Sequence, residues 1–283
     1  MRFSNIYHLI PFYIGTKSNV IPVYDCSYYF QGYVAQGFKS FFKENYDHYF
    51  FVADDLVLNP IINENNYTKH FRLKQNTCFL PGFITFHELK KYWHRTTESF
   101  QYNINIPGVE AKNKLPKYES TLLLFKKFGL EIEPLNFDQI WYNPGFSIRE
   151  WGRILLRDRF YIIRKILSEL TNKKYNLPYP LVGSYSDIFI VSSDAIKQFS
   201  HYCGVFATTK LFVEVALPTS LVLSAQEIIT EKDLKLQGEA LWTKEQYKIL
   251  NKYENKLMLL LKEFPKDHLY LHPIKLSKWD TQI

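Results

Sequence analysis

Two adjacent carboxylates follow a strongly apolar stretch early in the chain. The segment 49–60 opens with aromatic residues, reaches Asp54 and Asp55, and ends in an Asn-Pro pair. The aromatic and β-branched residues predict a buried strand, and the Asn-Pro pair predicts a change of chain direction. Paired carboxylates at the end of such a strand repel each other and lose hydration unless a cation lies between them. Mg²⁺ or Mn²⁺ carrying a diphosphate would compensate both costs, because these ions prefer oxygen ligands. A pair of capping or loop aspartates is the alternative.

A second short strand, predicted within residues 19–27, also leads to a carboxylate, Asp25. A helix expected over 31–43 separates the two strands. Strand, helix and strand with carboxylates at the strand ends is typical of nucleotide-binding βαβ units, whose ligands collect at those ends. The sequence contains neither the dinucleotide-binding glycine motif nor the P-loop motif, so a metal or side chains must hold the phosphates. This combination indicates a nucleotide-sugar site.

Two more carboxylates lie in apolar surroundings later in the chain. Asp187 precedes a strand predicted at 188–191, and Tyr185 places a hydroxyl beside it. Asp187 suits either a sugar-hydroxyl acceptor or a simple turn. Glu214 is the one carboxylate in the run 212–219. Burial raises the pKa of a carboxyl group, which suits a general base near neutral pH. An ion pair with an arginine from the basic segment 149–174 is the structural alternative.

The strand that ends in Ala53, Asp54 and Asp55 resembles the Asp-x-Asp region of GT-A-type glycosyltransferases. Ala53 stands where the first aspartate of that motif is usual. Near the other end of the chain, the segment 268–279 resembles a C-terminal segment of several such enzymes, through His272 and Lys275. The resemblance covers the first 60 residues and roughly the last 100. It implies an α/β, GT-A-like fold.

The resemblance also implies a metal-dependent nucleotide site. Asp55 and His272 would bind Mn²⁺ or Mg²⁺, and Asp54 would face the ion, the ribose or the donor sugar. Asp25 would contact the nucleoside. Lys275 would meet the diphosphate and stabilise it as it departs, because a cation neutralises developing charge.

The resemblance implies roles for the later carboxylates as well. Tyr185 would help to bind the donor, Asp187 would lie in the donor-sugar pocket, and Glu214 would act as general base or would position the sugar. The expected activity is transfer of a sugar from a nucleotide-diphosphate sugar to a glycan or lipid-linked acceptor. Synthesis of bacterial surface polysaccharide or lipopolysaccharide is the expected setting.

The length of 283 residues fits one GT-A-like catalytic domain. Within it, residues 1–70 are expected to form the nucleotide-binding half, and 71–180 an insertion on the acceptor side. Residues 181–283 would form the donor-sugar and acceptor half together with the C-terminal metal segment. Inside the insertion, the run 122–128 followed by Gly129 predicts a helix with a C-terminal glycine.

The segment 149–174 combines clustered arginines with apolar residues at helical spacing. Such a basic amphipathic helix can lie on an anionic membrane surface. It can equally bury its apolar stripe in the core, which is the commoner arrangement in globular proteins. Nucleic-acid binding is not expected, because no recognisable nucleic-acid module accompanies the basic residues.

Composition limits the setting of the protein. The apolar fraction of 46% is ordinary for a globular domain, and the formal net charge is +7. Three widely spaced cysteines argue against a disulfide framework and favour a reducing compartment. We find no targeting signal and no apolar window of membrane-spanning length. We therefore expect a cytoplasmic protein, with peripheral contact at the inner face of the membrane as a further expectation.

Two other functions remain open from the sequence. A nucleotidyltransferase also uses paired carboxylates on an α/β core, but it usually has a glycine-rich phosphate loop near the N-terminus. A non-catalytic sugar-nucleotide-binding protein of the same fold would keep the architecture and lose the metal site. The replacement of the expected aspartate by Ala53 is the observation that favours this last hypothesis.

Overall fold

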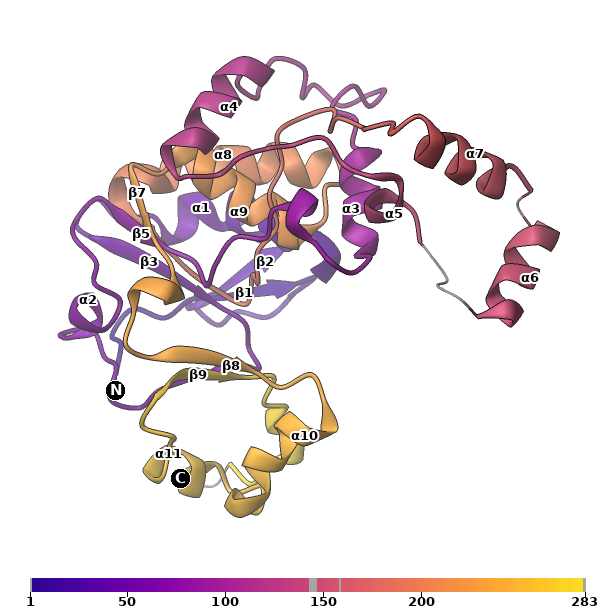
Figure 1. Ribbon diagram of the computed structural model, residues 1–283. Coiled ribbons are helices and arrows are strands. Elements are labelled where there is room, and N and C mark those ends of the chain that lie inside the picture. The colour runs from indigo at the N-terminus through magenta and orange to yellow at the C-terminus, as the bar shows by residue number, and fades with distance from the viewer. Residues whose placement is uncertain (1, 143–146, 158, 282–283) are drawn as a thin grey trace.

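The protein consists of an α/β body, a small C-terminal lobe and a projecting helical arm (Figure 1). The computed structural model describes residues 2–142, 147–157 and 159–281. We use "arm" for the two helices α6 (Ile148–Arg157) and α7 (Arg159–Leu170). The mixed α/β class expected from the sequence is confirmed.

The body is built on a four-stranded mixed sheet. Its strands, in spatial order, are β3 (His48–Val52), β6 (Ile188–Ser192), β5 (Thr77–Phe79) and β7 (Glu227–Ile229). Strand β6 runs antiparallel to both neighbours, and β5 runs parallel to β7. Strand β3 is therefore the last strand of this sheet rather than a central one, and Val52 at its end is 44% exposed.

The N-terminal strands form a sheet of their own. Strands β1 (His8–Pro11) and β2 (Val20–Val23) pair in parallel, and helix α1 (Gln31–Phe41) follows. The expected order of strand, helix and strand is present as β2, α1 and β3. The two strands, however, belong to different sheets, so they do not form the single βαβ unit that the sequence pattern predicts.

Alternation along β6 explains why the sheet is buried on both faces. Successive side chains of a strand point to opposite faces, so Phe189 and Val191 enter one core cluster while Ile188 and Ile190 enter another. The first cluster is covered by α1 and by two long helices that follow β6. These helices are α8 (Ser193–Thr208) and α9 (Val213–Ser224). The second cluster packs against residues of the C-terminal lobe, which fixes that lobe against the body.

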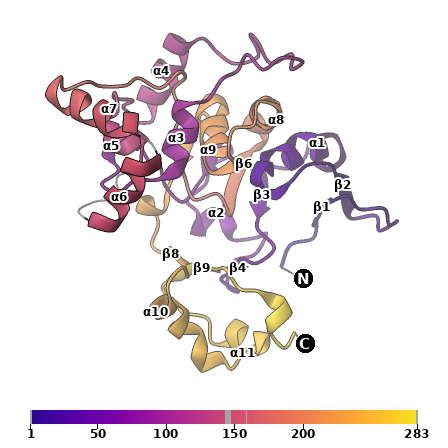
Figure 2. The ribbon, with the colours of Figure 1, turned by 90° about the vertical axis from the view of Figure 1, so that its right-hand side faces the viewer.

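The C-terminal lobe is tied to the acidic turn by a three-stranded sheet (Figure 2). Its strands are β4 (Val57–Leu58), β9 (His268–His272) and β8 (Gln237–Ala240), with β9 in the middle. Helices α10 (Lys244–Tyr247) and α11 (Leu257–Lys262) complete the lobe around the buried Tyr253. Because β4 begins just after Asp54 and Asp55, its pairing with β9 brings the two ends of the sequence together.

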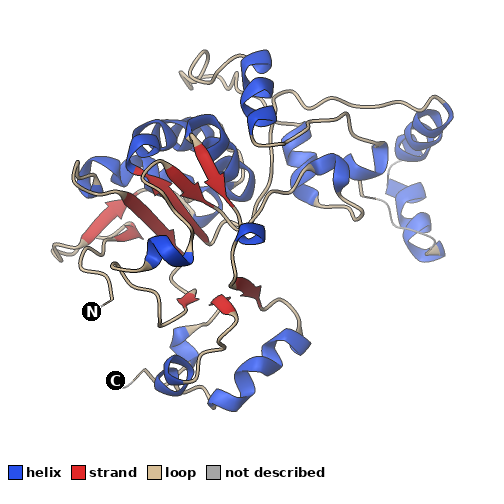
Figure 3. Ribbon diagram, turned by 60° about the vertical axis from the view of Figure 1, so that its left-hand side comes forward, coloured by secondary structure: helices blue, strands red, loops and turns tan. Residues whose placement is uncertain are grey.

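The middle of the chain contains several helices joined by long loops, and it lies beside the sheet (Figure 3). Its helices before the arm are α2 (Tyr67–His70), α3 (His94–Phe100), α4 (Tyr118–Lys127) and α5 (Phe137–Ile140). Helix α4 confirms the helix predicted at 122–128, and Gly129 after it has φ +69°. The region is more than an addition to the core, because β5 lies inside the main sheet. Short 3-10 helices occur at Ser27–Tyr29, Phe86–Glu88, Glu231–Asp233, Lys248–Tyr253 and Leu276–Lys278.

Candidate functional site

The acidic turn between β3 and β4 is held from two sides by backbone hydrogen bonds. The N–H of Ala53 donates to the carbonyl of Asp187 (2.8 Å), directly before β6. The N–H of Ile274, two residues beyond β9, donates to the carbonyl of Asp55 (2.6 Å). Three separate stretches of sequence therefore meet at this turn. The position of the Asp55 side chain is set by the main sheet and the C-terminal lobe together.

The structure brings Asp55 and His272 into direct contact although 217 positions separate them in the sequence. The Nε2 atom of His272 lies 2.8 Å from Oδ1 of Asp55 and 3.7 Å from Oδ1 of Asp187. His272 is only 5% exposed, whereas the side chain of Asp55 is 32% exposed. The hydroxyl of Tyr185 is hydrogen-bonded to the other ring nitrogen, Nδ1. Four of the residues singled out in the sequence thus form one cluster.

The Asp55–His272 contact is a hydrogen bond, and its length would also suit two neighbouring ligands of one metal ion. Donors on adjacent corners of an octahedron stand about 3 Å apart when each is about 2.1 Å from the ion. The observed 2.8 Å between Oδ1 and Nε2 is close to that value. Within the described ranges, no three His, Cys, Asp or Glu side chains are arranged to hold a metal by themselves. A metal bound to this pair would therefore take further ligands from a substrate phosphate or water, as Mg²⁺ commonly does.

Tyr185 supplies the outer support that a ligating histidine needs. When Nε2 of His272 directs its lone pair at a cation, Nδ1 carries the proton and donates to the oxygen of Tyr185. The tyrosine hydroxyl is then free to donate to Asp187, with which it also makes a side-chain hydrogen bond. Metal-bound histidines usually have such a partner on the second nitrogen, which fixes the ring orientation. The residues present therefore fit a divalent ion.

Three aromatic or acidic residues that the sequence did not indicate surround this support. The ring of Tyr185 stacks on Tyr270 at 6.2 Å with an interplanar angle of 6°. The ring of Trp242 stands edge-on to Tyr185 (6.3 Å) and to His272 (5.8 Å). The hydroxyl of Tyr270 donates to Oε1 of Glu231 (2.7 Å). Tyr270 lies on β9, and Glu231 and Trp242 lie on either side of β8, so the pairing of β8 with β9 brings the three residues together.

Asp187, a member of this cluster, forms an acidic pair with Glu214, on which it acts electrostatically. Burial raises the pKa of Asp187, while His272 opposes this shift and Asp55 adds to it. Burial likewise raises the pKa of Glu214, which Arg95 opposes and Asp187 reinforces. The N–H of Ser184 donates to the carbonyl of Glu214 (2.9 Å), so the start of α9 is fixed beside the segment before β6. Both carboxyl groups are therefore set to hold or release a proton closer to neutral pH than usual.

Among the side chains that the structure describes, the cation that acts on Glu214 is Arg95 of α3 rather than an arginine of the basic segment 149–174. The guanidinium carbon of Arg95 lies 3.2 Å from the ring centre of Phe212 and 5.7 Å from that of Tyr28. Its Nη1 contacts Oε1 of Glu98 at 2.7 Å, and its side chain is 13% exposed. A single arginine in a short helix carries no sequence signal, which is why sequence analysis misses it.

Asp25 lies two residues after the end of β2. Its Oδ1 accepts a hydrogen bond from the N–H of Cys26 (2.8 Å). A Cβ atom on Gly32 would stand 2.9 Å from Oδ2, so the first turn of α1 approaches this carboxylate closely. Burial raises the pKa of Tyr29, Asp25 adds to that shift and Arg95 opposes it, so both groups act on this tyrosine.

Asp54 and Lys275 flank the cluster and are open to solvent. Asp54 shares the turn with Asp55, and Lys275 follows His272 by three residues. Within the described part of the chain, neither side chain makes a hydrogen bond or an ion pair. Both charged groups are therefore available to a ligand that sits on the Asp55–His272 pair.

Two surface cavities lie away from these residues. One, of about 660 Å³, is lined by a mixture of both charges that includes Lys127, Glu131 and Lys232. The other, of about 610 Å³, lies between α1 and α8 and contains His201. Neither includes one of the carboxylates singled out in the sequence.

Comparison of the chain with protein-family models, with curated proteins and with solved structures finds no match. Among the described residues, no helix is both long enough and apolar enough to cross a membrane. The three cysteines are free, with Cys26 exposed and Cys78 and Cys203 buried.

Proposed function

We propose that the protein is a GT-A-type glycosyltransferase that moves a sugar from a nucleotide-diphosphate sugar to a glycan or lipid-linked acceptor. The observation that carries the proposal is the contact between Asp55 and His272, because the resemblance pairs these two residues in advance of any structure. Tyr185 and Asp187 lie on the same histidine. An acidic turn without a binding role is not expected to contact an imidazole and its supporting hydroxyl from segments that are distant in the sequence.

The diphosphate of the donor would bind at the Asp55–His272 pair. A divalent ion held there would neutralise the phosphate oxygens and act as a Lewis acid on the leaving group. Tyr185 holds the imidazole of His272 through Nδ1, so that Nε2 would stay oriented toward the ion. Lys275 adds a solvent-accessible positive charge for the departing diphosphate, and Asp54 offers acceptor oxygens to ribose or sugar hydroxyls. The incomplete Asp-x-Asp motif thus still leaves two protein ligands.

Glu214 and Asp187 are the groups available for proton transfer. A general base works best when its pKa lies near the working pH, and burial moves both carboxyl groups in that direction. Glu214 takes the proton of the acceptor hydroxyl in an inverting reaction, or positions the sugar in a retaining one. Arg95 limits the upward shift of the Glu214 pKa, which keeps a share of the carboxylate ionised.

The nucleoside end of the donor would lie toward Asp25 and Tyr28. Asp25 supplies a half-exposed carboxylate that can accept hydrogen bonds from ribose or base. Tyr28 is 59% exposed and packs edge-on against Phe212 at 5.8 Å. A flat aromatic surface beside a carboxylate is well suited to a base with a ribose. Arg95 connects this end to the acidic pair.

A panel of nucleotide sugars tests the proposal. Each donor is incubated with the protein and Mn²⁺, and hydrolysis and protection against heat are scored with and without chelator. We expect one nucleoside diphosphate to raise the melting temperature only with metal, and one matching donor to be slowly hydrolysed. Protection by a nucleoside triphosphate with pyrophosphate release would indicate a nucleotidyltransferase instead. Metal-independent binding without hydrolysis would indicate a non-catalytic binding protein.

A further inference from the structure

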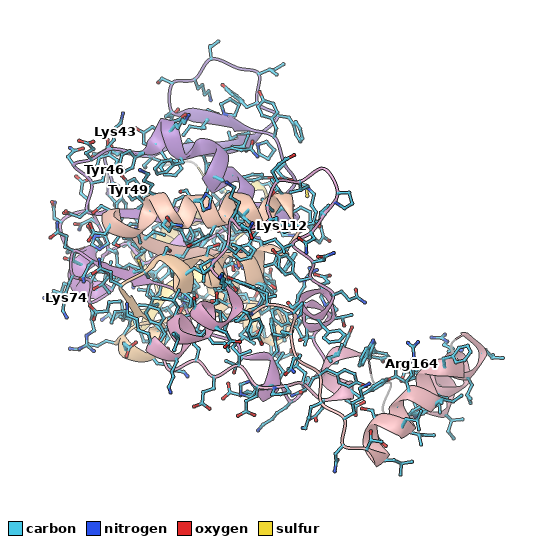
Figure 4. All side chains as sticks on the ribbon, turned by 90° about the horizontal axis from the view of Figure 1, so that it is seen from above. Lys43, Tyr46, Tyr49, Lys74, Lys112 and Arg164 are labelled. Atoms are coloured by element: carbon cyan, nitrogen blue, oxygen red, sulfur yellow. The ribbon has the colours of Figure 1, made fainter. Side chains whose placement is uncertain are left out.

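The arm carries its apolar side chains on the outside. On α7, Phe160, Ile163, Leu167 and Leu170 recur at helical spacing along one side and are 71%, 53%, 55% and 78% exposed. On α6, three more apolar side chains are at least half exposed: Ile148 (89%), Leu155 (52%) and Leu156 (85%). The arm projects from the body in Figures 1 and 4, and Figure 4 shows Arg164 on the arm, well apart from the labelled lysines of the body. The segment therefore does not bury its apolar stripe in the core, which was the commoner of the two expected arrangements.

The opposite side of α7 is the side that faces the protein. Lys165 forms ion pairs with Asp138 of α5 (2.6 Å) and with Glu169 (3.1 Å), and its side chain is 12% exposed. Tyr161 packs its ring against Phe137 of α5 at 5.2 Å. An ordinary surface helix turns its apolar stripe to the core and its charges to water. Helix α7 is anchored by its polar side instead, so the apolar stripe needs another partner.

We propose that the arm docks on an anionic lipid bilayer. Apolar side chains of this size enter the boundary between headgroups and acyl chains, and basic residues beside them meet the acidic headgroups. Arg164 borders the stripe of α7, and Arg149 and Arg153 stand one turn apart beside the apolar side of α6; all three are exposed. The chain as a whole carries a formal net charge of +7, which adds to the attraction.

The charges favour a bilayer over a second copy of the chain. A symmetric dimer places the same patch of both copies face to face. The arginines beside the apolar stripe would then approach each other, and like charges at a desolvated contact are unfavourable. An anionic surface complements them. This inference stands on the arm alone and does not depend on sugar transfer.

Vesicle sedimentation tests the inference with the full chain. Pellets are compared for vesicles of phosphatidylcholine alone and for vesicles with phosphatidylglycerol, at low salt. We expect binding to the anionic vesicles only, with a loss of about fivefold in partition for Arg164→Ala, as one basic residue near an anionic surface contributes. Lys112→Ala, on the body, is the matched charge control and should leave partition unchanged.

A second variant pair isolates the apolar contribution. Leu167→Ser with Leu170→Ser should reduce vesicle binding at least tenfold, because two exposed leucines lose most of their apolar surface. Leu123→Ser on α4, which changes a 72% exposed leucine elsewhere, should have no effect. Unchanged melting temperatures show that all variants are folded. Failure of the wild-type protein to bind anionic vesicles overturns the inference. So does a dimer in sedimentation velocity that the leucine variants abolish, since it would assign the stripe to a second copy.

Discussion

The hydroxyl of Tyr185 offers the sharpest way to separate a metal-supporting role from a structural one. Tyr185→Phe removes the hydrogen bonds to Nδ1 of His272 and to Asp187. It keeps the aromatic ring, and with it the stacking on Tyr270 and the contact with Trp242. The packing of the cluster should therefore survive while the orientation of the imidazole is lost.

Tyr270, whose ring stacks on that of Tyr185, provides a matched control. Tyr270→Phe removes a buried hydroxyl that donates to Glu231 at 2.7 Å. It leaves the hydrogen bond between Tyr185 and His272 intact. Each variant leaves a polar partner without its hydrogen bond, so each should lower the free energy of unfolding by about 1–3 kcal/mol. Loss of an outer partner of a metal-bound histidine typically weakens metal binding about 10- to 100-fold, or about 1.4–2.7 kcal/mol. Only Tyr185→Phe should weaken metal binding in this way.

Titration calorimetry of a nucleoside diphosphate at saturating and limiting Mn²⁺ measures the difference, and urea denaturation of the same preparations measures stability. We expect similar stability losses for the two variants and weakened metal-dependent binding for Tyr185→Phe alone. Equal affinities for both variants would show that the Tyr185 hydroxyl has no part in holding a metal ligand, and the reasoning about its role would be refuted.

Three further changes test other parts of the account. Glu214→Gln should cut sugar transfer about 10²–10⁴-fold while donor binding persists; unchanged turnover per folded molecule would remove this residue from the reaction. Because burial raises the pKa of Glu214, the folded state keeps its proton to a higher pH than the unfolded state. The wild type should thus lose stability relative to Glu214→Gln as the pH rises above about 4.5, the ordinary pKa, in urea titrations at pH 4 and pH 7. Lys275→Ala should weaken nucleoside diphosphate binding about fivefold, less at high salt, and leave nucleoside binding unchanged; a salt-independent loss would argue against a charge effect. Phe199→Ala, at a fully buried position against Phe51 and Phe189, should lower the free energy of unfolding by about 3–5 kcal/mol; a loss below 1 kcal/mol would contradict the packing described.

The sequence predicted the parts of the site that are encoded locally. A carboxylate after an apolar strand, as at Asp55, can be recognised because strand and turn are short-range structures. The partnership with His272 came only through resemblance, since spacing alone does not reveal that β4 pairs with β9. Glu214 could be suspected from its apolar neighbours, but the identity of its cation could not. That cation is Arg95, and its position depends on how α3 packs against the start of α9.

The fold was predictable to the same limited extent. The helix 118–127 carried its own end signal in Gly129, and the structure has it. The position of β3 at the end of the main sheet was not predictable. A strand whose two faces are both covered has the same apolar sequence pattern at the edge of a sheet as in its middle. The outward stripe of the arm was unpredictable for a related reason. Periodicity gives the two sides of a helix, and the contacts of Lys165 with Asp138 and of Tyr161 with Phe137 show which side faces the protein.

Binding of a nucleoside diphosphate to Asp55→Ala tests the central claim most directly. Asp267→Ala is the matched control, because Oδ1 of Asp267 contacts Nδ1 of His268 at 2.9 Å, a similar acidic–imidazole contact outside the cluster. The account predicts that wild type and Asp267→Ala bind the diphosphate with Mn²⁺ or Mg²⁺ and lose it with chelator. Asp55→Ala should remain folded and show no metal-dependent binding in calorimetry. Equal metal-dependent binding by Asp55→Ala and Asp267→Ala would contradict the account.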